Sequence, residues 1–180
     1  KSYDILYCGR MEKSKGIEDF INVVGLLKRK NPSIKAAIIG DCPTTYFKYL
    51  EELGYKLSCW ENIHFIGFVK TQSMMFNYFK ASKLFLVPTL VDRYPSTIRE
   101  AMRIKIPVVA YRTGSIPWTN NNGENIVLVD HGCISQMAAA VEVLLGDSEQ
   151  QKKLSQAAWQ FYEDEFSCDK NTDRFISGYK

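Results

Sequence analysis

Hydrophobic positions along this chain of 180 residues fall into two alternating patterns. Short runs that are almost wholly apolar, beginning with residues 4–8, alternate with longer segments in which apolar residues recur every three or four positions. The second pattern places apolar side chains on one face of a helix, whereas a short apolar run between turn residues is typical of a buried strand. The chain therefore predicts strands and helices in alternation.

The first predicted helix shows how the limits of an element are assigned. It follows the strand at residues 4–8, and the pair Asn31-Pro32 ends it because proline cannot continue a helix. Its apolar stripe consists of Ile17, Phe20, Ile21, Val24 and Leu27.

The same alternation extends to residue 164. The further predicted strands span residues 36–39, 63–66, 84–87, 107–111 and 126–129. The further predicted helices span residues 44–59, 72–82, 96–104, 133–145 and 149–164, with a short helical turn near Ile116. Six short strands separated by helices favour a three-layer α/β fold, in which a parallel sheet with right-handed crossovers carries helices on both faces. Ligands of such sheets bind at the carboxyl ends of the strands, where the strand order reverses.

Composition narrows the class of protein further. With 180 residues, 46% of them hydrophobic and 24% charged, the chain has the size of one globular domain, so we expect a single domain over residues 1–180. The net charge of +3 and the scattered lysines and arginines do not indicate a nucleic-acid partner. No apolar run reaches about 18 residues and no secretory leader precedes the first strand, so we expect no membrane span.

The cysteines and histidines do not have the spacing of a disulfide framework or a zinc site. They are Cys8, Cys42, Cys59, Cys133 and Cys168 with His64 and His131. No Cys-x-x-Cys pair is present, and neither histidine has a second ligand at the usual spacing. We therefore expect reduced thiols, a cytoplasmic protein, no bound metal, and histidines that are solvated or at strand edges.

A basic turn, residues 9–16, joins the first strand to the first helix. Its side chains Arg10 and Lys15 lie near a helix N-terminus, where unpaired amides, the helix dipole and positive charge all favour phosphate. The turn is neither a Walker loop nor the Gly-x-Gly-x-x-Gly turn of a dinucleotide-binding fold. Taken alone, the two cations could also be solvated residues beside a helix start.

A second polar segment follows the strand predicted at residues 84–87. Asp92 falls in the loop after that strand, and Glu100 falls about one turn inside the helix predicted to begin near Ser96. The Glu100 carboxylate can accept two hydrogen bonds from a ribose diol, while the Asp92 carboxylate can accept hydrogen bonds from hydroxyls of a sugar. Two structural explanations stay open: Thr97 and Glu100 fit a capping box, and Asp92 could be an ordinary loop acid. The joint occurrence of the carboxylates with the basic turn favours a binding site.

Six segments carry a resemblance to a known family. The chain resembles the C-terminal, nucleotide-sugar-binding domain of GT-B fold glycosyltransferases of the large retaining family four, also called group 1. The matching segments are Gly9–Gly16, Ile39–Pro43, Phe65–Val69, Asp92–Met102, Pro107–Ala110 and Gly114–Trp118, in the order that the family has them. The resemblance implies a Rossmann-like sandwich that forms one half of a GT-B enzyme.

The resemblance also implies roles for individual residues. Arg10 and Lys15 would bind the pyrophosphate, Glu100 the ribose, and Asp92 with backbone amides at Ser96 and Thr97 the donor sugar. Gly67, Phe68 and Val69 would line the base pocket, and Gly40 belongs to the same nucleotide site. Asp92, Arg10 and Lys15 are the residues expected to act in catalysis. The donor would be a UDP- or GDP-sugar, with no other cofactor and no metal.

The activity implied is retaining, metal-independent transfer of a hexose to a glycan or a lipid-linked acceptor, as in the synthesis of surface polysaccharides. The acceptor would bind an N-terminal domain that this chain does not contain, so the chain alone is expected to bind donor and transfer nothing. The full-length protein would be cytoplasmic, with peripheral association at the inner face of the membrane as one possibility.

Two alternatives remain within this resemblance. One is a sugar-nucleotide epimerase of the same architecture, and the other is a module that binds nucleotide or a partner without catalysis. The second is suggested by departures from the family pattern. Asp92 replaces a glutamate, Cys42, Lys105 and Ser115 replace glycines, and Trp118 replaces a glutamate. A receiver-type signalling domain is disfavoured because Gly9 and Arg10 stand where it needs a phosphoacceptor aspartate.

Overall fold

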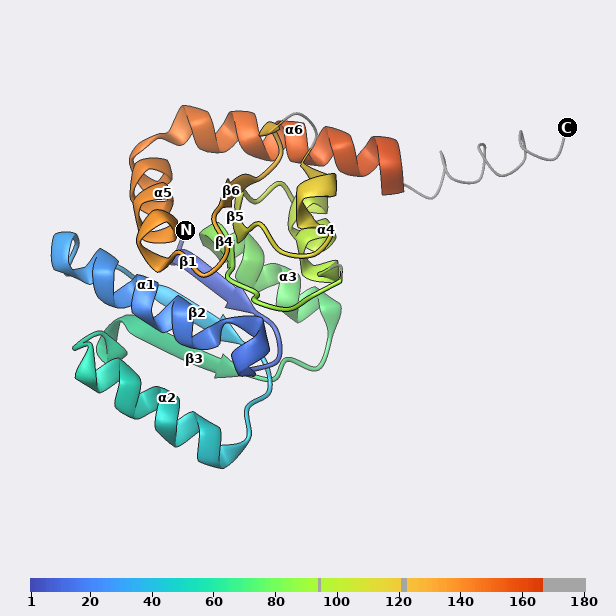
Figure 1. The fold of residues 1–180 in the computed structure, drawn as a ribbon. Helices are drawn as coiled ribbons and strands as arrows, with labels where there is room; N and C mark the ends of the chain where they lie inside the picture. The colour runs from blue at the N-terminus through green and yellow to red at the C-terminus, as the bar shows by residue number, and fades with distance from the viewer. Residues whose placement is uncertain (94, 121–122, 167–180) are drawn as a thin grey trace, which may run out of the picture.

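The computed structural model describes residues 1–93, 95–120 and 123–166, which form one parallel sheet with helices on both faces (Figure 1). The strands lie in the order β3-β2-β1-β4-β5-β6. Their bounds are β1 Tyr3–Cys8, β2 Ala36–Ile39, β3 Ile63–Gly67, β4 Ser82–Val87, β5 Val108–Tyr111 and β6 Val127–Val129. The predicted three-layer α/β fold is confirmed.

The helices divide between the two faces of the sheet. Their bounds are α1 Ile17–Lys30, α2 Thr44–Lys56, α3 Gln72–Ala81, α4 Ser96–Arg103, α5 Ile134–Gly146 and α6 Ser148–Phe166. Short 3-10 turns are η1 Lys13–Lys15, η2 Trp60–Asn62 and η3 Ile116–Thr119. One core cluster joins the sheet to α1, α2 and α5, and a second joins its other face to α3, α4 and α6.

The inner strands are buried on both faces, which explains their continuous apolar runs, whereas the edge strand β3 is only partly buried. In β1, Ile5 and Tyr7 pack into the α1 side of the core, whereas Leu6 between them packs into the α4 side. Successive side chains of a strand point to opposite faces, so a strand between two helical layers needs apolar residues at every position. The apolar runs are thus a direct consequence of the three-layer arrangement.

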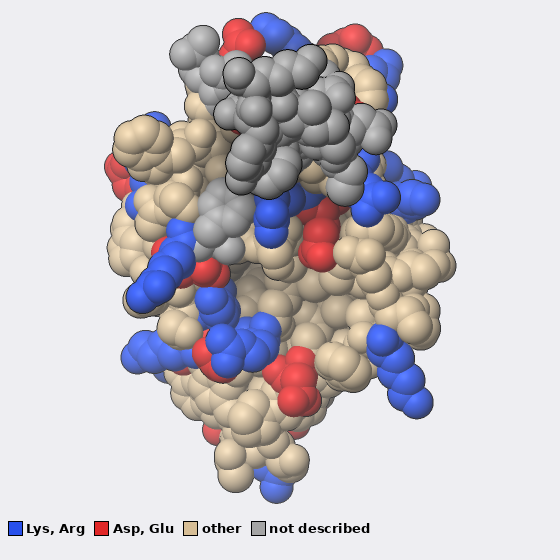
Figure 2. Space-filling model, turned by 90° about the vertical axis from the view of Figure 1, so that its right-hand side faces the viewer, with Lys and Arg blue, Asp and Glu red and all other residues tan. Residues whose placement is uncertain are grey.

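The strand order reverses between β1 and β4. From β1 the chain proceeds outward to β2 and β3, then returns to pair β4 with the other edge of β1. The loops that leave β1 and β4 therefore diverge and open a crevice at the carboxyl ends of the strands. Figure 2 shows a hollow with charged residues around its rim on this face of the molecule.

Most predicted element limits lie within two residues of the observed ones, and two of the differences have a clear local cause. The helix predicted over residues 44–59 ends at Lys56, because Ser58 adopts a left-handed conformation (φ 55°) and the separate turn η2 follows. The strand predicted from residue 84 begins at Ser82, immediately after α3, where the Ser82 hydroxyl donates a hydrogen bond to the carbonyl of Tyr78. Local turn conformation, which has little hydrophobic signal, accounts for both differences.

Cys8, Cys42, Cys59 and Cys133 carry free thiols, and Cys168 lies outside the described residues, as does most of the tail from residue 166. Within the described ranges, no helix has the length and apolar character needed to cross a membrane. His64 pairs with the hydroxyl of Tyr3 at a surface position, as expected for a strand-edge histidine.

Candidate functional site

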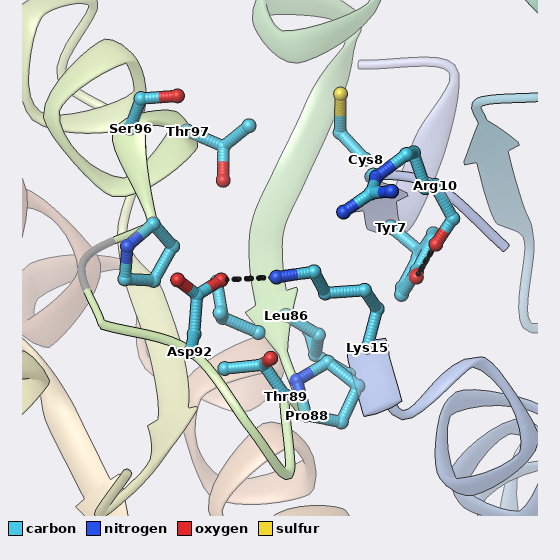
Figure 3. Close-up of a pocket in the computed structure, with 13 residues that line it drawn as sticks. Tyr7, Cys8, Arg10, Lys15, Leu86, Pro88, Thr89, Asp92, Ser96 and Thr97 are labelled. Atoms are coloured by element: carbon cyan, nitrogen blue, oxygen red, sulfur yellow. Dashed lines mark hydrogen bonds and ion pairs between the residues drawn. The ribbon is translucent and has the colours of Figure 1, made fainter. Parts of the chain in front are cut away.

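A cavity of about 230 Å³ lies at the crevice between β1 and β4. Five of the predicted site residues line it: Arg10, Lys15, Asp92, Ser96 and Thr97. Figure 3 shows Arg10 and Lys15 on one side of this cavity and Asp92, Ser96 and Thr97 on the other. The fold therefore brings together two segments that are about eighty residues apart in the sequence.

The two loops that form the cavity are joined by main-chain contacts. The amides of Leu90 and Val91 both donate to the carbonyl of Ser14, at 2.9 and 3.0 Å. Gly16 has a φ of 70°, and a Cβ atom there would lie 1.7 Å from the carbonyl oxygen of Pro88. Only glycine permits this approach, so the turn of residues 9–16 is fixed against the end of β4.

An ion pair spans the cavity. The Lys15 ammonium lies 2.7 Å from Asp92 Oδ2, and the two side chains are only 24% and 17% exposed. Arg10 instead pairs with Glu12 at 2.8 Å, and its side chain is 71% exposed. The two predicted phosphate-binding cations thus differ: Arg10 lies at the solvent-facing rim and Lys15 lies deeper, against a carboxylate.

The loop that carries Asp92 is held from behind by the turn at residues 113–115. A Cβ atom on Gly114, whose φ is 54°, would lie 2.0 Å from the carbonyl oxygen of Asp92. The amide of Ser115 donates to the carbonyl of Arg93 at 3.1 Å, and the Ser115 hydroxyl donates to the same oxygen. Ser115 has a φ of −92°, which suits any residue, so its replacement of a glycine creates no backbone strain.

Ser96 and Thr97 are the first two residues of α4 and also line the cavity. Main-chain amides in the first turn of a helix have no partner within the helix, and the helix dipole makes this end electropositive. Pro95 is the N-cap residue of α4 and makes no side-chain cap bond, while Thr97 lies inside the helix. The capping-box explanation of Thr97 and Glu100 is therefore wrong.

Glu100 lies in a separate cavity of about 200 Å³ between α3, α4 and α6, which shares Ser96 with the first. Its carboxylate accepts a hydrogen bond of 3.3 Å from Gln72 Nε2. The negative charge of Glu100 contributes, after burial, to raising the pKa of the Cys8 thiol to about 12. Cys8 lines the first cavity, whereas Glu100 does not.

A third cavity of about 400 Å³ adjoins the first, and both are lined by Cys8, Gly9 and Arg10. Its walls include Phe68, Val69 and Gly40, as predicted, and most of its surface is apolar. Gly67 does not line it but supports it, because its carbonyl accepts a hydrogen bond of 3.0 Å from the Gly40 amide.

The tight approach of β2 to the basic turn depends on Gly40. Its φ is 150°, and a Cβ atom there would lie 1.9 Å from the carbonyl oxygen of Gly9. The apolar cavity and the charged cavity therefore meet at the Gly9–Arg10 segment. Together they form a continuous surface that is apolar at one end and ionic at the other.

Comparison with known proteins identifies the family. The model of the family "Glycosyl transferases group 1" matches residues 1–161. The chain belongs to this family. It represents the C-terminal GT-B domain of a group 1 glycosyltransferase, as the six sequence segments predicted.

Individual glycosyltransferases align over most of the chain. The capsular polysaccharide biosynthesis glycosyltransferase CapM of Staphylococcus aureus is 26% identical over 167 residues, which are 92% of this chain and 43% of CapM. A D-inositol 3-phosphate glycosyltransferase of Corynebacterium glutamicum is 26% identical over 162 residues, which are 86% of this chain and 38% of that protein. The chain thus spans less than half the length of these relatives.

Solved structures share the fold. The C-terminal domain of the group 1 family protein LpcC from Francisella tularensis superposes with a TM-score of 0.83 at 25% identity, covering 92% of this chain and 87% of that one. Anabaena HepE, solved in complex with UDP-glucose, superposes with a TM-score of 0.87 at 18% identity, covering 99% of this chain and 49% of HepE. HepE supports the fold assignment alone.

Several lining residues of this glycosyltransferase domain were not predicted from the sequence, among them Tyr7, Cys8 and Met75. Tyr7 donates a hydrogen bond of 2.9 Å from its hydroxyl to the carbonyl of Arg10, and burial raises its pKa far above the ordinary value. It is therefore a neutral donor that holds the basic turn. The position of Tyr7 and Cys8 at the end of the strand before the turn is the signal that could have identified them.

Two departures from the family pattern lie away from the cavities. Trp118 is 87% exposed on η3, and no described cavity includes it. Lys105 adopts a φ of 56°, a conformation that favours the glycine it replaces, and its ammonium lies 3.8 Å from the centre of the Trp159 ring. Neither residue alters the lining of the candidate site.

Proposed function

We propose that this chain is the donor-binding domain of a two-domain glycosyltransferase and that it binds a nucleoside-diphosphate sugar at the crevice between β1 and β4. The observation that supports this proposal is the junction of an apolar cavity with an ionic one at the Gly9–Arg10 segment. A sugar nucleotide has the same sequence of chemical groups: a flat base, then a charged diphosphate, then a ring of hydroxyls.

Each part of the donor has a complementary surface. In this proposal the base lies against Phe68 and Val69 in the apolar cavity, where aromatic and aliphatic side chains suit a planar ring. The diphosphate lies near Arg10 and Lys15, at the first-turn amides of α4, because cations and a helix N-terminus both favour phosphate. Asp92 accepts hydrogen bonds from hydroxyls of the sugar.

Glu100 is assigned to the ribose in this proposal. It lies on α4 and lines the cavity that shares Ser96 with the ionic one, and its charge contributes to raising the pKa of Cys8 at the junction of the ionic and apolar cavities. The ribose stands between base and diphosphate, so a carboxylate beside that junction is suitably placed. The hydrogen bond from Gln72 orients the Glu100 carboxylate.

The chemistry that follows is departure of the nucleoside diphosphate from the anomeric carbon. Negative charge grows on the leaving diphosphate, and fixed cations with helix amides stabilise it without help from a metal. Arg10 and Lys15 act in this step, and Asp92 orients the hexose. We propose retention of configuration at the anomeric carbon, as the family resemblance implies.

The remainder of the proposal concerns the whole protein. Because the chain spans 43% of CapM and 38% of the inositol-phosphate enzyme, we propose that residues 1–180 form one domain and that an acceptor domain lies N-terminal to it. CapM acts in capsular polysaccharide biosynthesis, which supports a glycan or lipid-linked acceptor for the present protein. A cytoplasmic enzyme at the inner face of the membrane suits such an acceptor.

The proposal is tested by calorimetric titration of the chain with UDP-glucose and GDP-mannose. Saturable binding of one donor is expected, and Arg10→Ala should weaken it by about tenfold or more, since a charge-assisted hydrogen bond contributes roughly 1.5–3 kcal/mol. Glu100→Gln should weaken it as well. Lys30→Ala, which removes an exposed cation paired with Glu142 on another surface, is the matched control and should leave the affinity unchanged. No saturation at millimolar donor would refute the proposal.

A further inference from the structure

Both cations of the candidate site are paired with carboxylates of the chain itself. Arg10 pairs with Glu12 at 2.8 Å and Lys15 pairs with Asp92 at 2.7 Å. A diphosphate must therefore compete with a carboxylate for each cation. This competition is unequal, because the two ion pairs differ in burial.

The Arg10–Glu12 pair is a surface pair. Its side chains are 71% and 42% exposed, and a pair of this kind has little net stability because water and salt screen it. The Lys15–Asp92 pair is only 24% and 17% exposed, so its attraction is screened less. A diphosphate can therefore replace Glu12 at Arg10 at little cost, whereas it must compete with a more strongly held carboxylate, Asp92, for Lys15.

Asp92 has a second proposed partner, the hydroxyls of the donor sugar. We infer that Asp92 determines selectivity for a sugar nucleotide over the corresponding bare nucleoside diphosphate, by holding Lys15 until sugar hydroxyls replace the ammonium at its carboxylate. This inference rests on the proposed function, because it assumes that a diphosphate and a sugar bind at this cavity. It adds an exchange of partners to the binding roles: Lys15 moves from Asp92 to the diphosphate, and Asp92 binds sugar hydroxyls in place of Lys15.

The surroundings of the ion pair favour such an exchange. The main chain at Asp92 is fixed by Gly114 behind it and by the bonds from Leu90 and Val91 to Ser14. Lys15 ends the turn η1, next to Gly16, which lies against Pro88. Because both main-chain segments are held, only the two side chains need to move, and a long lysine side chain can turn toward a phosphate without displacing the loops.

The charge of the ligand acts in the same direction. A bare nucleoside diphosphate ends in a phosphate that carries more negative charge than the same group esterified to a sugar. The Asp92 carboxylate, which points into the cavity beside Lys15, repels the more highly charged end more strongly (Figure 3). A bare diphosphate also has no sugar hydroxyls that could donate hydrogen bonds to Asp92 once Lys15 has left it.

The test compares dissociation constants of the chain for UDP and UDP-glucose, and for GDP and GDP-mannose, by calorimetry. Asp92→Asn keeps the shape of the side chain but removes its charge. We expect this variant to bind the bare diphosphate about threefold or more tightly than the wild type, because Lys15 is released. We expect it to bind the sugar nucleotide more weakly, so that the preference for sugar nucleotide falls by about tenfold or more.

Glu12→Gln is the matched control, because it also removes a carboxylate that pairs with a cation of the site. Arg10 serves the diphosphate that both ligands share, so this variant should shift both affinities in the same direction and leave their ratio within about twofold. Lys15→Gln is a second variant, and it should weaken sugar-nucleotide binding more than binding of the bare diphosphate. Thermal unfolding of each variant shows whether the fold is retained.

The outcomes separate this inference from the proposed function. If the wild type binds a sugar nucleotide but Asp92→Asn and Lys15→Gln both leave the ratio of affinities unchanged, the inference is wrong and the proposed function stands. The same holds if Glu12→Gln changes the ratio as much as Asp92→Asn. If the wild type binds none of the four ligands at millimolar concentration, the proposed function fails and the inference fails with it.

Discussion

Replacing Gly114 by alanine tests whether the turn at residues 113–115 fixes the position of Asp92. Two costs are expected. The first is backbone strain, because Gly114 has a φ of 54° and a left-handed conformation costs a residue with a Cβ atom about 1–2 kcal/mol. The second is a steric clash with the main chain of Asp92.

The size of the clash follows from the geometry. The new Cβ atom would lie 2.0 Å from the Asp92 carbonyl oxygen, whereas ordinary contact begins at 3.4 Å. The loop or the turn must therefore move by about 1.4 Å, the difference between these two distances. Because main chain is involved, we expect an added cost of about 1–3 kcal/mol, similar to that of overpacking a core.

Gly132→Ala is the matched control. Gly132 has a φ of 71°, and a Cβ atom there would meet nothing within 4 Å, so the control carries the strain without the clash. Urea unfolding should show a loss of about 1–2 kcal/mol for Gly132→Ala and about 2–5 kcal/mol for Gly114→Ala. Donor affinity should fall only in Gly114→Ala, since only that change displaces Asp92. Equal losses of stability and unchanged donor affinity in the two variants would refute the reasoning.

Two further predictions concern the side chains of Tyr111 and Cys8. The hydroxyl of Tyr111, a fully buried residue, donates to Asp19 Oδ2 at 2.9 Å, so Tyr111→Phe should lower the free energy of unfolding by about 1–3 kcal/mol in urea titrations, and an unchanged value would contradict this. Burial raises the pKa of Cys8 to about 12, so at pH 8 only about one thiol in ten thousand is ionised, and mass spectrometry should find Cys8 alkylated far more slowly than an exposed model thiol. Alkylation of Cys8 at the model rate would contradict the burial argument.

The fold was predictable because its signal is repeated along the whole chain. The inner strands β2, β4 and β5 are buried between two helical layers, so their apolar runs are unbroken, and each helix packs on one side only, so its apolar residues recur at helical spacing. Features that depend on one turn were not predictable in this way. The left-handed conformation of Ser58, which ends α2 early, has no counterpart in the hydrophobic pattern.

The positions of the candidate site residues were predictable in part. Five of the predicted residues line one cavity because strand ends of a parallel sheet converge on the same edge. The position of Glu100 in a neighbouring cavity, and the indirect role of Gly67, depend on how α4 and β3 are rotated, which residue spacing does not specify. The ion pairs of Lys15 and Arg10 depend on side-chain rotamers, so the sequence could name these residues but not their partners.

The central claim, that a sugar nucleotide binds at the crevice between β1 and β4, is tested most directly by NMR titration of the isotopically labelled chain with UDP-glucose and GDP-mannose. One of these donors should shift the backbone amides of residues 9–15 and of Ser96 and Thr97, with further shifts at Phe68 and Val69 in the apolar cavity. The chemical shifts of amides near the amino ends of the strands, such as those of Lys35 and His64, should not change. Shift changes confined to the amino ends of the strands, or no shift changes at millimolar donor, would contradict the account.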